Sequence, residues 1–554
     1  MSLQEVYVFE VTTVSPAWIR SQLIGSDAVV QTPFGTRVLT YADYVASGRG
    51  LALVERIIRD QVLPYYANTH TEDSFTGAST SKLAHEAAEY IKAQVGAPEY
   101  KIIFAGSGST AAIKRLQDML GLTVPSSRRA ELLASLPLAQ RPVVFVGPYE
   151  HHSNEVSWRE SIAEVVEIPL CPQGMIDLGA LRVALQDAKF AGRQKIGSFS
   201  AASNVTGMIS DTRAIARLLH EHEAFAFFDF AASAPYVAID MKPGSVDGYD
   251  AIFISPHKFI GGPGTPGILV FNPVLYTLAT PSTAGGGTVT YVSSSAHHFT
   301  DDIEAREDAG TPAIIQKIRA GLVFWVKNAM GVATIEQREE TFIRTAIARL
   351  QKHPNVALLG NLEAPRLAML SFMVRSTDGG YLHPRFVVRL LNDLFGIQSR
   401  GGCACAGPYG HRLLNIGDAV SHGYRDAILE GFEGIKPGWT RLNFNSFISD
   451  EEFEFLLAAI EFIADVGERF VQLYQFDWRT GAWTHPRDVA PPSFVAVLES
   501  ALAQPAAAPA NNTPTIPNYQ QYLAAARELA ASLVMQPSRQ VPDNINSSLV
   551  FFKH

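Results

Sequence analysis

Two ionisable side chains stand where apolar, strand-like runs of the sequence end. Asp229 closes the run AFAFFDF, and Lys258 follows DAIFISPH at the start of a glycine-rich stretch. A buried carboxylate needs a cationic partner, and a protonated ring nitrogen would serve as one. A lysine held in a secluded site has a lowered pKa and forms an imine with a carbonyl group. Taken singly, Asp229 fits a helix cap equally well, and a surface position is the alternative for Lys258.

The loop GSGSTAAIKRL, residues 106–116, follows another apolar run and begins a helix-like pattern. Free N–H groups at the start of a helix, together with the helix dipole, favour a phosphate group, and Ser109 and Thr110 add hydroxyl donors. The loop is not a Walker A motif, because no lysine follows its last glycine at the required place. An ordinary strand-to-helix turn is the alternative.

Cysteine and arginine share one glycine-rich segment, IQSRGGCACAGPYG, which holds Arg400, Cys403 and Cys405. A thiol beside an arginine has the electrostatic setting that favours thiolate, although two inert small residues in a tight turn would give the same pattern. Cys171 is the only other cysteine. A four-thiolate zinc site therefore cannot be assembled within one chain.

A histidine pair and a lone arginine complete the candidate set. His151 and His152 follow the run RPVVFVGPYE, where an imidazole can stack on an aromatic ring. We expect no metal there, because adjacent side chains in an extended segment diverge and no matching ligand pattern lies nearby. Arg441, in GWTRLNF, presents a planar fork that suits a carboxylate.

The elements that position these residues are apolar runs alternating with helical patterns. The runs begin near residues 101, 141, 195, 224 and 250, and each ends in a polar cluster. This alternation predicts an α/β fold with a mostly parallel sheet covered on both faces. Ligands bind at the carboxyl ends of such strands, so the polar clusters should converge in space.

The domain organisation follows from changes in pattern along the chain. We expect an N-terminal segment over 1–40, a large ligand-binding domain over 41–330 and a smaller α+β domain over 331–490. Residues 491–554 would form a linker and a C-terminal helical extension, because the stretch 501–518 is rich in alanine and proline.

Composition excludes several classes of protein. The chain has 554 residues, 47% of them hydrophobic, a net charge of −9 and only three cysteines. We therefore expect a multi-domain soluble protein without a disulfide framework, and no nucleic-acid partner. The apolar stretches are broken by charge before they could span a bilayer, and the N-terminus lacks a signal-peptide pattern. These features favour a cytoplasmic protein without a membrane partner.

Together the motifs resemble the class V aminotransferase superfamily. This branch of the fold-type I pyridoxal-phosphate (PLP) enzymes contains cysteine desulfurases, selenocysteine lyases, kynureninases and the N-terminal domain of molybdenum-cofactor sulfurases. The similarity extends from TYADYVASG at residue 40 to TRLNFNSF at residue 440. The resemblance implies a large PLP-binding domain, a smaller domain and a homodimer with shared active sites.

The resemblance also implies a role for each candidate residue. On the cofactor side, the phosphate would be held by Ser109, Thr110, Ser255 and His257, and by Thr311 from the neighbouring subunit. The ring would be contacted by His151, which stacks on it, by Asn204 at its oxygen side and by Asp229 at its nitrogen, while Lys258 forms the Schiff base. On the substrate side lie Asn68, His70, Arg400 and Arg441.

The expected activity is that of a cysteine desulfurase or a related C–S or C–Se lyase acting on an amino acid. Cys405 matches the final residue of the family's R-x-G-x-x-C loop and would accept the sulfur as a persulfide, leaving alanine. An aminotransferase, an epimerase or another lyase without a catalytic thiol is the alternative among enzymes. A sulfur-delivery module for an acceptor protein is the alternative of another class. One departure is Ala232, where many relatives carry a glutamine that contacts the ring oxygen.

Overall fold

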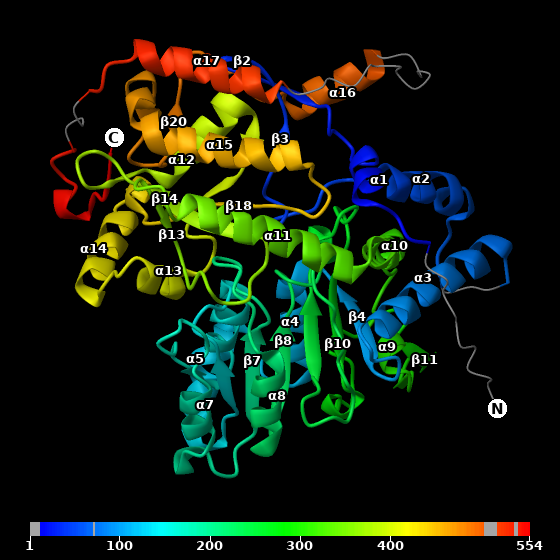
Figure 1. The fold of residues 1–554 in the computed structure, drawn as a ribbon. Coiled ribbons are helices and arrows are strands. Elements are labelled where there is room, and N and C mark those ends of the chain that lie inside the picture. The colour runs from blue at the N-terminus through cyan, green and yellow to red at the C-terminus, as the bar shows by residue number, and fades with distance from the viewer. Residues whose placement is uncertain (1–11, 70–72, 504–517, 537–540, 554) are drawn as a thin grey trace.

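A seven-stranded sheet forms the centre of the larger domain in the computed structural model, which describes residues 12–69, 73–503, 518–536 and 541–553 (Figure 1). The strands stand in the order β4-β10-β9-β8-β7-β5-β6. β10 is antiparallel to both of its neighbours, and the other pairings are parallel. The strands are β4 (Lys101–Ala105), β5 (Val143–Val146), β6 (Glu164–Glu167), β7 (Lys195–Ser200), β8 (Ala224–Asp229), β9 (Ala251–Ile254) and β10 (Gly267–Phe271). This arrangement confirms the predicted α/β fold and all five of the predicted strand runs.

Both faces of this sheet are buried, because successive side chains along each strand point to opposite sides. Ile102 and Phe228 belong to one apolar cluster, whereas their neighbours Ile103 and Phe227 belong to another on the opposite face. The first cluster is covered by α3 (Phe75–Gln94), α7 (Leu178–Leu185), α8 (Thr212–Glu221) and α10 (Ile314–Met330). The second is covered by α4 (Gly108–Met119) and α6 (Val156–Arg159). Burial on both faces explains why the strand runs are almost continuously apolar.

A smaller α+β unit follows α10, as predicted, and lies above the large sheet in Figure 1. Its four strands are antiparallel and stand in the order β13-β14-β18-β17. They are β13 (Val356–Leu358), β14 (Met369–Val374), β17 (Arg400–Gly402) and β18 (Trp439–Asn443), packed with α11 (Val332–Leu350), α12 (Pro384–Phe395) and α15 (Asp450–Val466). Gly331, at φ +77°, breaks the helix between α10 and α11, a conformation that favours glycine.

The two ends of the chain pack against this smaller unit. β3 (Thr40–Tyr41) pairs in parallel with β16 (Ile397–Gln398), and β21 (Phe552–Lys553) pairs in parallel with β15 (Tyr381–Leu382). The predicted C-terminal helix is α17 (Tyr519–Ser532), whose Tyr519 ring stacks on Phe455 with centroids 4.1 Å apart. By contrast, α16 (Phe494–Ala503) has no buried residue. The extension is therefore docked through α17 and the last strand.

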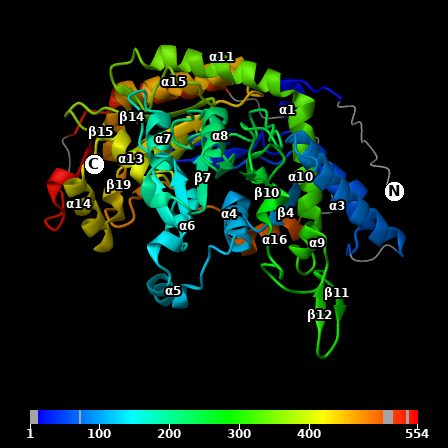
Figure 2. The ribbon, with the colours of Figure 1, turned by 90° about the horizontal axis from the view of Figure 1, so that it is seen from below.

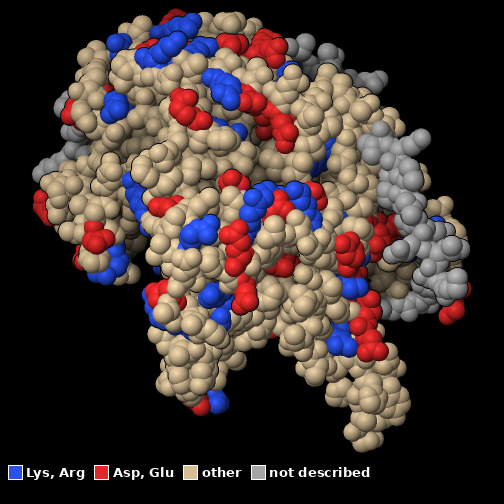
Figure 3. Space-filling model, turned by 60° about the horizontal axis from the view of Figure 1, so that its bottom comes forward, with Lys and Arg blue, Asp and Glu red and all other residues tan. Residues whose placement is uncertain are grey.

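The remaining elements lie at the periphery. They are α1 (Pro16–Ser21), β1 (Val29–Thr32), β2 (Gly35–Val38), α2 (Ala52–Ile57), α5 (Arg129–Ser135), β11 (Val289–Val292), β12 (His297–Phe299), α9 (Ile303–Arg306), α13 (Gly407–Leu413), α14 (Asp418–Leu429), β19 (Gln475–Phe476) and β20 (Trp483–Thr484). Figure 2 shows the β11–β12 hairpin and α5 projecting from the large domain. On the face in Figure 3, acidic and basic side chains are interspersed. Within the described ranges, no helix has the length and apolar character needed to cross a bilayer.

Two leucines of the extension test how firmly it is docked. Leu523 on α17 is 3% exposed in the smaller unit's core, whereas Leu502 on α16 is 86% exposed. Leu523→Ala should lower the free energy of unfolding by about 2–5 kcal/mol, because it leaves a cavity in a packed core. The matched change Leu502→Ala should alter it by less than about 0.5 kcal/mol. Urea unfolding followed by circular dichroism measures both, and equal effects would contradict the docking of α17.

Candidate active site

One cavity lies where the carboxyl ends of β4, β5, β7, β8 and β9 meet, and the smaller unit closes it from above. The predicted residues that line it are Ser109, Thr110, His151, Asn204, Asp229, Ser255, His257, Lys258, Arg400, Cys405 and Arg441. Each strand contributes the polar cluster that follows it, which is the convergence expected at the carboxyl edge of a parallel sheet. Segments separated by about half the chain thus form one site.

The start of α4 forms an anion cradle on one side of the cavity. The Ser109 backbone N–H donates to Ser255 Oγ at 2.9 Å, and the two hydroxyls lie 3.0 Å apart. Gly108 adopts φ +58°, and a Cβ there would lie 2.8 Å from His257 Cε1. Only glycine therefore fits between the helix start and the 255–258 turn. N-terminal amides of α4 and hydroxyls converge here, as an anion such as phosphate requires.

Asp229 ends β8 as a buried carboxylate, with 4% of the residue exposed. Its Oδ1 accepts the Ala231 backbone N–H at 2.8 Å. Burial raises the pKa of this carboxyl, while the Ala231 hydrogen bond and the positive charge of Lys258 act in the opposite direction. Among the described residues no arginine or lysine forms an ion pair with Asp229 within 4.0 Å. A cationic ring nitrogen in the cavity would supply the missing partner.

Lys258 stands on the turn after β9, the neighbouring strand. Burial lowers the pKa of its amine to about 8, with the negative charge of Asp229 opposing that shift and Arg441 adding to it. Burial and the nearby Lys258 charge also lower the pKa of His257 to about 4. The lowered pKa increases the unprotonated fraction of Lys258 near neutral pH relative to an ordinary lysine, and this is the form in which an amine adds to an aldehyde.

His151 presents a neutral ring to the cavity. Its Nδ1 accepts the Ser153 backbone N–H at 3.1 Å and lies 3.0 Å from the Ser153 hydroxyl. Burial and the Lys258 charge lower the pKa of the imidazole to about 4. The Ser153 hydroxyl also contacts Thr110 Oγ1 at 2.6 Å, so it links the ring to the helix start. Sequence analysis missed Ser153, although it lies two residues beyond His151.

Glu150, which sequence analysis also missed, holds the segment before His151 in place. Its carboxylate accepts hydrogen bonds from Gly147 N, Ser200 N, Ser200 Oγ and Asn154 Nδ2 at 2.6–3.1 Å. Burial raises the pKa of this carboxyl to about 7, and the hydrogen bonds from Ser200 and Asn154 oppose the shift. Glu150 therefore ties the end of β5 to the end of β7.

Arg441, on β18, brings the smaller unit into the site. Its Nη2 lies 2.9 Å from Asp43 Oδ1, and its Nη1 donates to the Asn204 carbonyl at 2.8 Å. Asn204 Nδ2 donates in turn to the Ala404 carbonyl at 2.7 Å. Asn204 Oδ1 is buried and has no hydrogen-bond partner among the described residues. Asp43 is a further residue that the sequence did not single out, because its partner lies 398 positions away.

The two cysteines of the 403–405 turn differ in position. Cys405 lines the cavity with Arg400, whereas Cys403 is exposed and does not line it. Ala404 and Cys405 both adopt left-handed backbone conformations, with φ of +49° and +57°. Such a conformation costs roughly 1–2 kcal/mol for each residue that carries a Cβ. The surrounding contacts must therefore stabilise the turn that presents the Cys405 thiol.

Two predicted residues, Asn68 and Thr311, do not line this cavity and are exposed in the single chain, and a third, His70, lies outside the described residues. Thr311 follows the β11–β12 hairpin and α9 in the sequence. The roles suggested for these three residues remain predictions.

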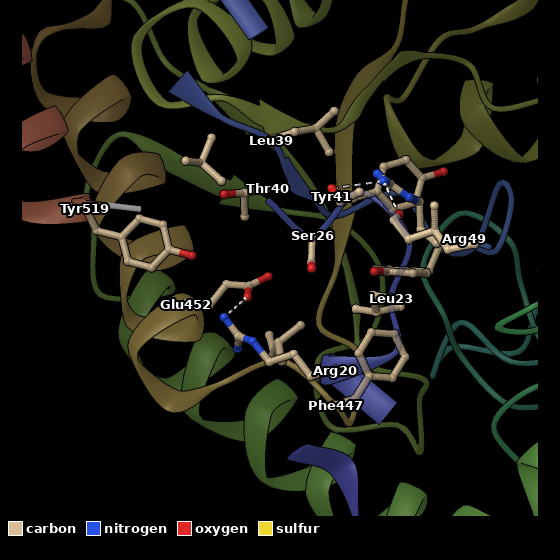
Figure 4. A pocket seen from close by; sticks show the side chains of 15 residues that line it. Arg20, Leu23, Ser26, Leu39, Thr40, Tyr41, Arg49, Phe447, Glu452 and Tyr519 are labelled. Atoms are coloured by element: carbon tan, nitrogen blue, oxygen red, sulfur yellow. Dashed lines mark hydrogen bonds and ion pairs between the residues drawn. The ribbon is translucent and has the colours of Figure 1, made fainter. Parts of the chain in front are cut away.

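Figure 4 shows a second cavity, lined by residues of α1, β3, α15 and α17. Arg20 forms an ion pair there with Glu452 at 2.9 Å. Arg49 Nη2 donates to the Ile24 carbonyl at 2.9 Å. This cavity contains neither Lys258 nor any other ionisable group of the first cavity. We therefore interpret it as a junction between the two ends of the chain, and place the candidate chemistry in the first cavity.

The first cavity fits the PLP group that the resemblance implies. The cradle at Gly108 suits the phosphate, Asp229 suits a protonated ring nitrogen, and Lys258 suits the aldehyde carbon. Asn204 and Ala232 both line the cavity, and the buried Asn204 Oδ1, which has no hydrogen-bond partner among the described residues, offers an acceptor. No cluster of three or more His, Cys, Asp or Glu side chains suited to a metal ion occurs in the described part of the chain.

Comparison with known proteins agrees with this geometry. The family model described as aminotransferase class-V matches residues 40–421. A probable cysteine desulfurase from Vibrio cholerae is 27% identical over 433 residues, covering 77% of this chain and 94% of the relative. The cysteine desulfurase from Dickeya dadantii is 26% identical over 383 residues, covering 69% of this chain and 86% of the relative. The apo cysteine desulfurase from Thermococcus onnurineus has the same fold, with a TM-score of 0.65 at 21% identity, covering 82% of this chain and all of that one.

The titration of Lys258 tests the electrostatics of the site. In cofactor-free protein, the acetylation rate of Lys258 should rise with a midpoint near pH 8, because burial destabilises the charged amine. Asp229→Asn removes the negative charge that favours the ammonium form, so the midpoint should move to lower pH. Trace labelling with peptide mass spectrometry measures the rate, with exposed Lys114 as the reference. An upward shift in Asp229→Asn would contradict the proposed coupling.

Proposed function

Because the chain belongs to the class-V aminotransferase family, we propose that it is a PLP-dependent cysteine desulfurase that forms a persulfide on Cys405. The observation that carries the proposal is the shared cavity of Lys258, Asp229, Arg441 and Cys405. An imine-forming amine, a carboxylate for a ring nitrogen, a binding group for a carboxylate and a thiol are the groups that the reaction needs. The names of the relatives from Vibrio cholerae and Dickeya dadantii support the same assignment.

The large domain supplies the cofactor-binding groups. Ser109, Thr110, Ser255, His257 and the start of α4 hold the phosphate, Asp229 keeps the ring nitrogen protonated, and His151 and Asn204 contact the ring. When bound, PLP provides an electron sink for bonds at the substrate α-carbon. His151 is suited to stacking because its ring is neutral and fixed by Ser153. The Lys258 amine, whose pKa is lowered to about 8, would move protons at the substrate carbons.

The smaller unit supplies the substrate-binding and sulfur-accepting groups. Arg441 binds the α-carboxylate of cysteine, which must compete with Asp43 for the guanidinium. Arg400 adds positive charge at the same edge of the cavity. The Cys405 thiol lines the same cavity, and its thiolate is the form that attacks sulfur. Arg400 and Arg441 stand opposite each other on β17 and β18, so both arginines reach the cavity from the smaller unit.

The sulfur step is a transfer between two thiol groups. The Cys405 thiolate attacks the sulfur of the substrate, an S–S bond forms, and the substrate Cβ–S bond breaks. The electron pair of that bond remains on the substrate carbon skeleton, which takes up a proton and leaves as alanine. Cysteine and the Cys405 thiol are thereby converted into alanine and the Cys405 persulfide, with no external oxidant or reductant.

The assembly and its partners are part of the same proposal. We infer a homodimer in which Thr311 reaches the phosphate of the neighbouring subunit, in keeping with the exposure of Thr311 in the single chain. The persulfide would pass to an acceptor protein that approaches the 403–405 turn, whose Cys403 is exposed. We place the reaction in the cytoplasm, in keeping with three cysteines that form no disulfide.

Substitution of the two turn cysteines tests the function. Cys405→Ser should abolish sulfide release from cysteine in the presence of dithiothreitol, because serine cannot accept the sulfur. Its visible spectrum with PLP and its change on adding cysteine should persist. The matched variant Cys403→Ser should retain most activity, since Cys403 lies outside the cavity. If Cys405→Ser kept full activity toward the protein's best amino-acid substrate, the desulfurase assignment would fall in favour of an aminotransferase or epimerase, reactions that need Lys258 and Arg441 but no thiol.

A further inference from the structure

The turn that carries Cys405 lies between β17 and α13 and has little support of its own. Its internal hydrogen bond joins Ala406 N to the Cys403 carbonyl at 3.2 Å. Ala404 and Cys405 both adopt positive φ, which L-residues rarely do. No side chain of the N-cap residue, Ala406, caps α13. Contacts from other segments must therefore hold this turn.

His152 makes two hydrogen bonds to the chain just after the Cys405 side chain. Its backbone N–H donates to the Cys405 carbonyl at 3.0 Å, and its ring Nε2 accepts the Gly407 N–H at 3.0 Å. Gly407 is the first residue of α13, and its N–H is one of the four that a helix cannot satisfy internally. The His152 ring therefore replaces the missing N-cap side chain from a distance of 255 residues.

The His152 ring has different surroundings from the ring of His151, the histidine proposed to stack on the cofactor. His151 lines the cavity and His152 does not. The ring centroids of the pair lie 6.3 Å apart, with planes inclined by 46°. Because Nε2 accepts a hydrogen bond from the Gly407 N–H, the ring is engaged with the turn. The second histidine of the pair therefore has a task that neither metal binding nor stacking on the cofactor explains.

We propose that His152 is a positioning residue that clamps the Cys403–Gly407 turn and so holds the Cys405 thiol inside the cavity. The expected effect of this clamp on catalysis rests on the proposed sulfur transfer. Its structural content is independent of that reaction, because it concerns only how the turn is held. Asn204 contributes from the adjacent strand end by donating to the Ala404 carbonyl at 2.7 Å. The ends of β5 and β7 thereby fix the turn from two directions.

Three variants separate the acceptor function of the ring from its volume. His152→Ala removes both, His152→Phe keeps a ring without an acceptor, and His152→Gln places an amide oxygen where it can accept the Gly407 N–H. Holoenzyme is treated with iodoacetamide, and alkylation of Cys405 relative to Cys403 is followed by peptide mass spectrometry. The Ala and Phe variants should raise this ratio about tenfold, the effect of losing one such hydrogen bond, while Gln should stay near the wild-type value.

Activity gives a second readout. In the Ala and Phe variants, kcat for sulfide release should fall about tenfold with KM and PLP content unchanged, because Arg441 and the cofactor site are intact. His411→Ala is the matched control, because His411 lies on α13, the helix that the His152 ring contacts. Among the bonds described, His411 Nδ1 contacts only Ser421 Oγ, at 3.3 Å. It should change neither readout.

The outcomes distinguish this proposal from the proposed function. An unchanged Cys405 to Cys403 alkylation ratio in His152→Phe would overturn the clamp, even if activity fell through lost stability. An active Cys405→Ser variant would overturn the desulfurase assignment but leave the alkylation test valid. If the Ala and Phe variants do not fold, hydrogen exchange of the wild-type protein tests the clamp instead. The Gly407 amide must exchange slowly, and rapid exchange would refute the clamp.

Discussion

Asp229 and Lys258 place opposite charges in one cavity at the ends of adjacent strands, and the rest of the site is arranged around them. Burial disfavours the charged form of each, while each favours the charged form of the other. In the described part of the chain neither forms a direct ion pair, and the cavity that both line suits a bound group with an electrophilic carbon at one end and a basic ring nitrogen at the other. The parallel pairing of β8 with β9 sets their separation.

This constraint explains the division of labour between the two parts of the chain. The large sheet is buried on both faces, and that packing gives a rigid edge for the cofactor-binding groups. The smaller unit contributes Arg441 and Cys405, the two residues to which the proposed function assigns contact with the substrate. Asn204 joins the two parts, because its backbone accepts from Arg441 and its amide donates to Ala404. Substrate binding and thiol position therefore share one connecting residue.

Sequence patterns predicted the cavity because its residues directly follow the strands, and the carboxyl ends of parallel strands meet. Lys258 and Asp229 could be identified in this way. Asp43 and Glu150 could not, since their partners are 398 and 50 positions distant. The left-handed conformation of Cys405 was also beyond prediction, because flanking glycines would have accommodated the same turn. Its cause lies in contacts with His152 and Asn204, which only the folded chain brings together.

The central claim is that Lys258 is the residue to which PLP is attached. The protein is incubated with PLP, reduced with borohydride, digested and examined by mass spectrometry. The account predicts a pyridoxyl-phosphate mass increment on the peptide that carries Lys258, and its loss in Lys258→Ala. Stoichiometric labelling of a different lysine, or none at any lysine, would contradict it.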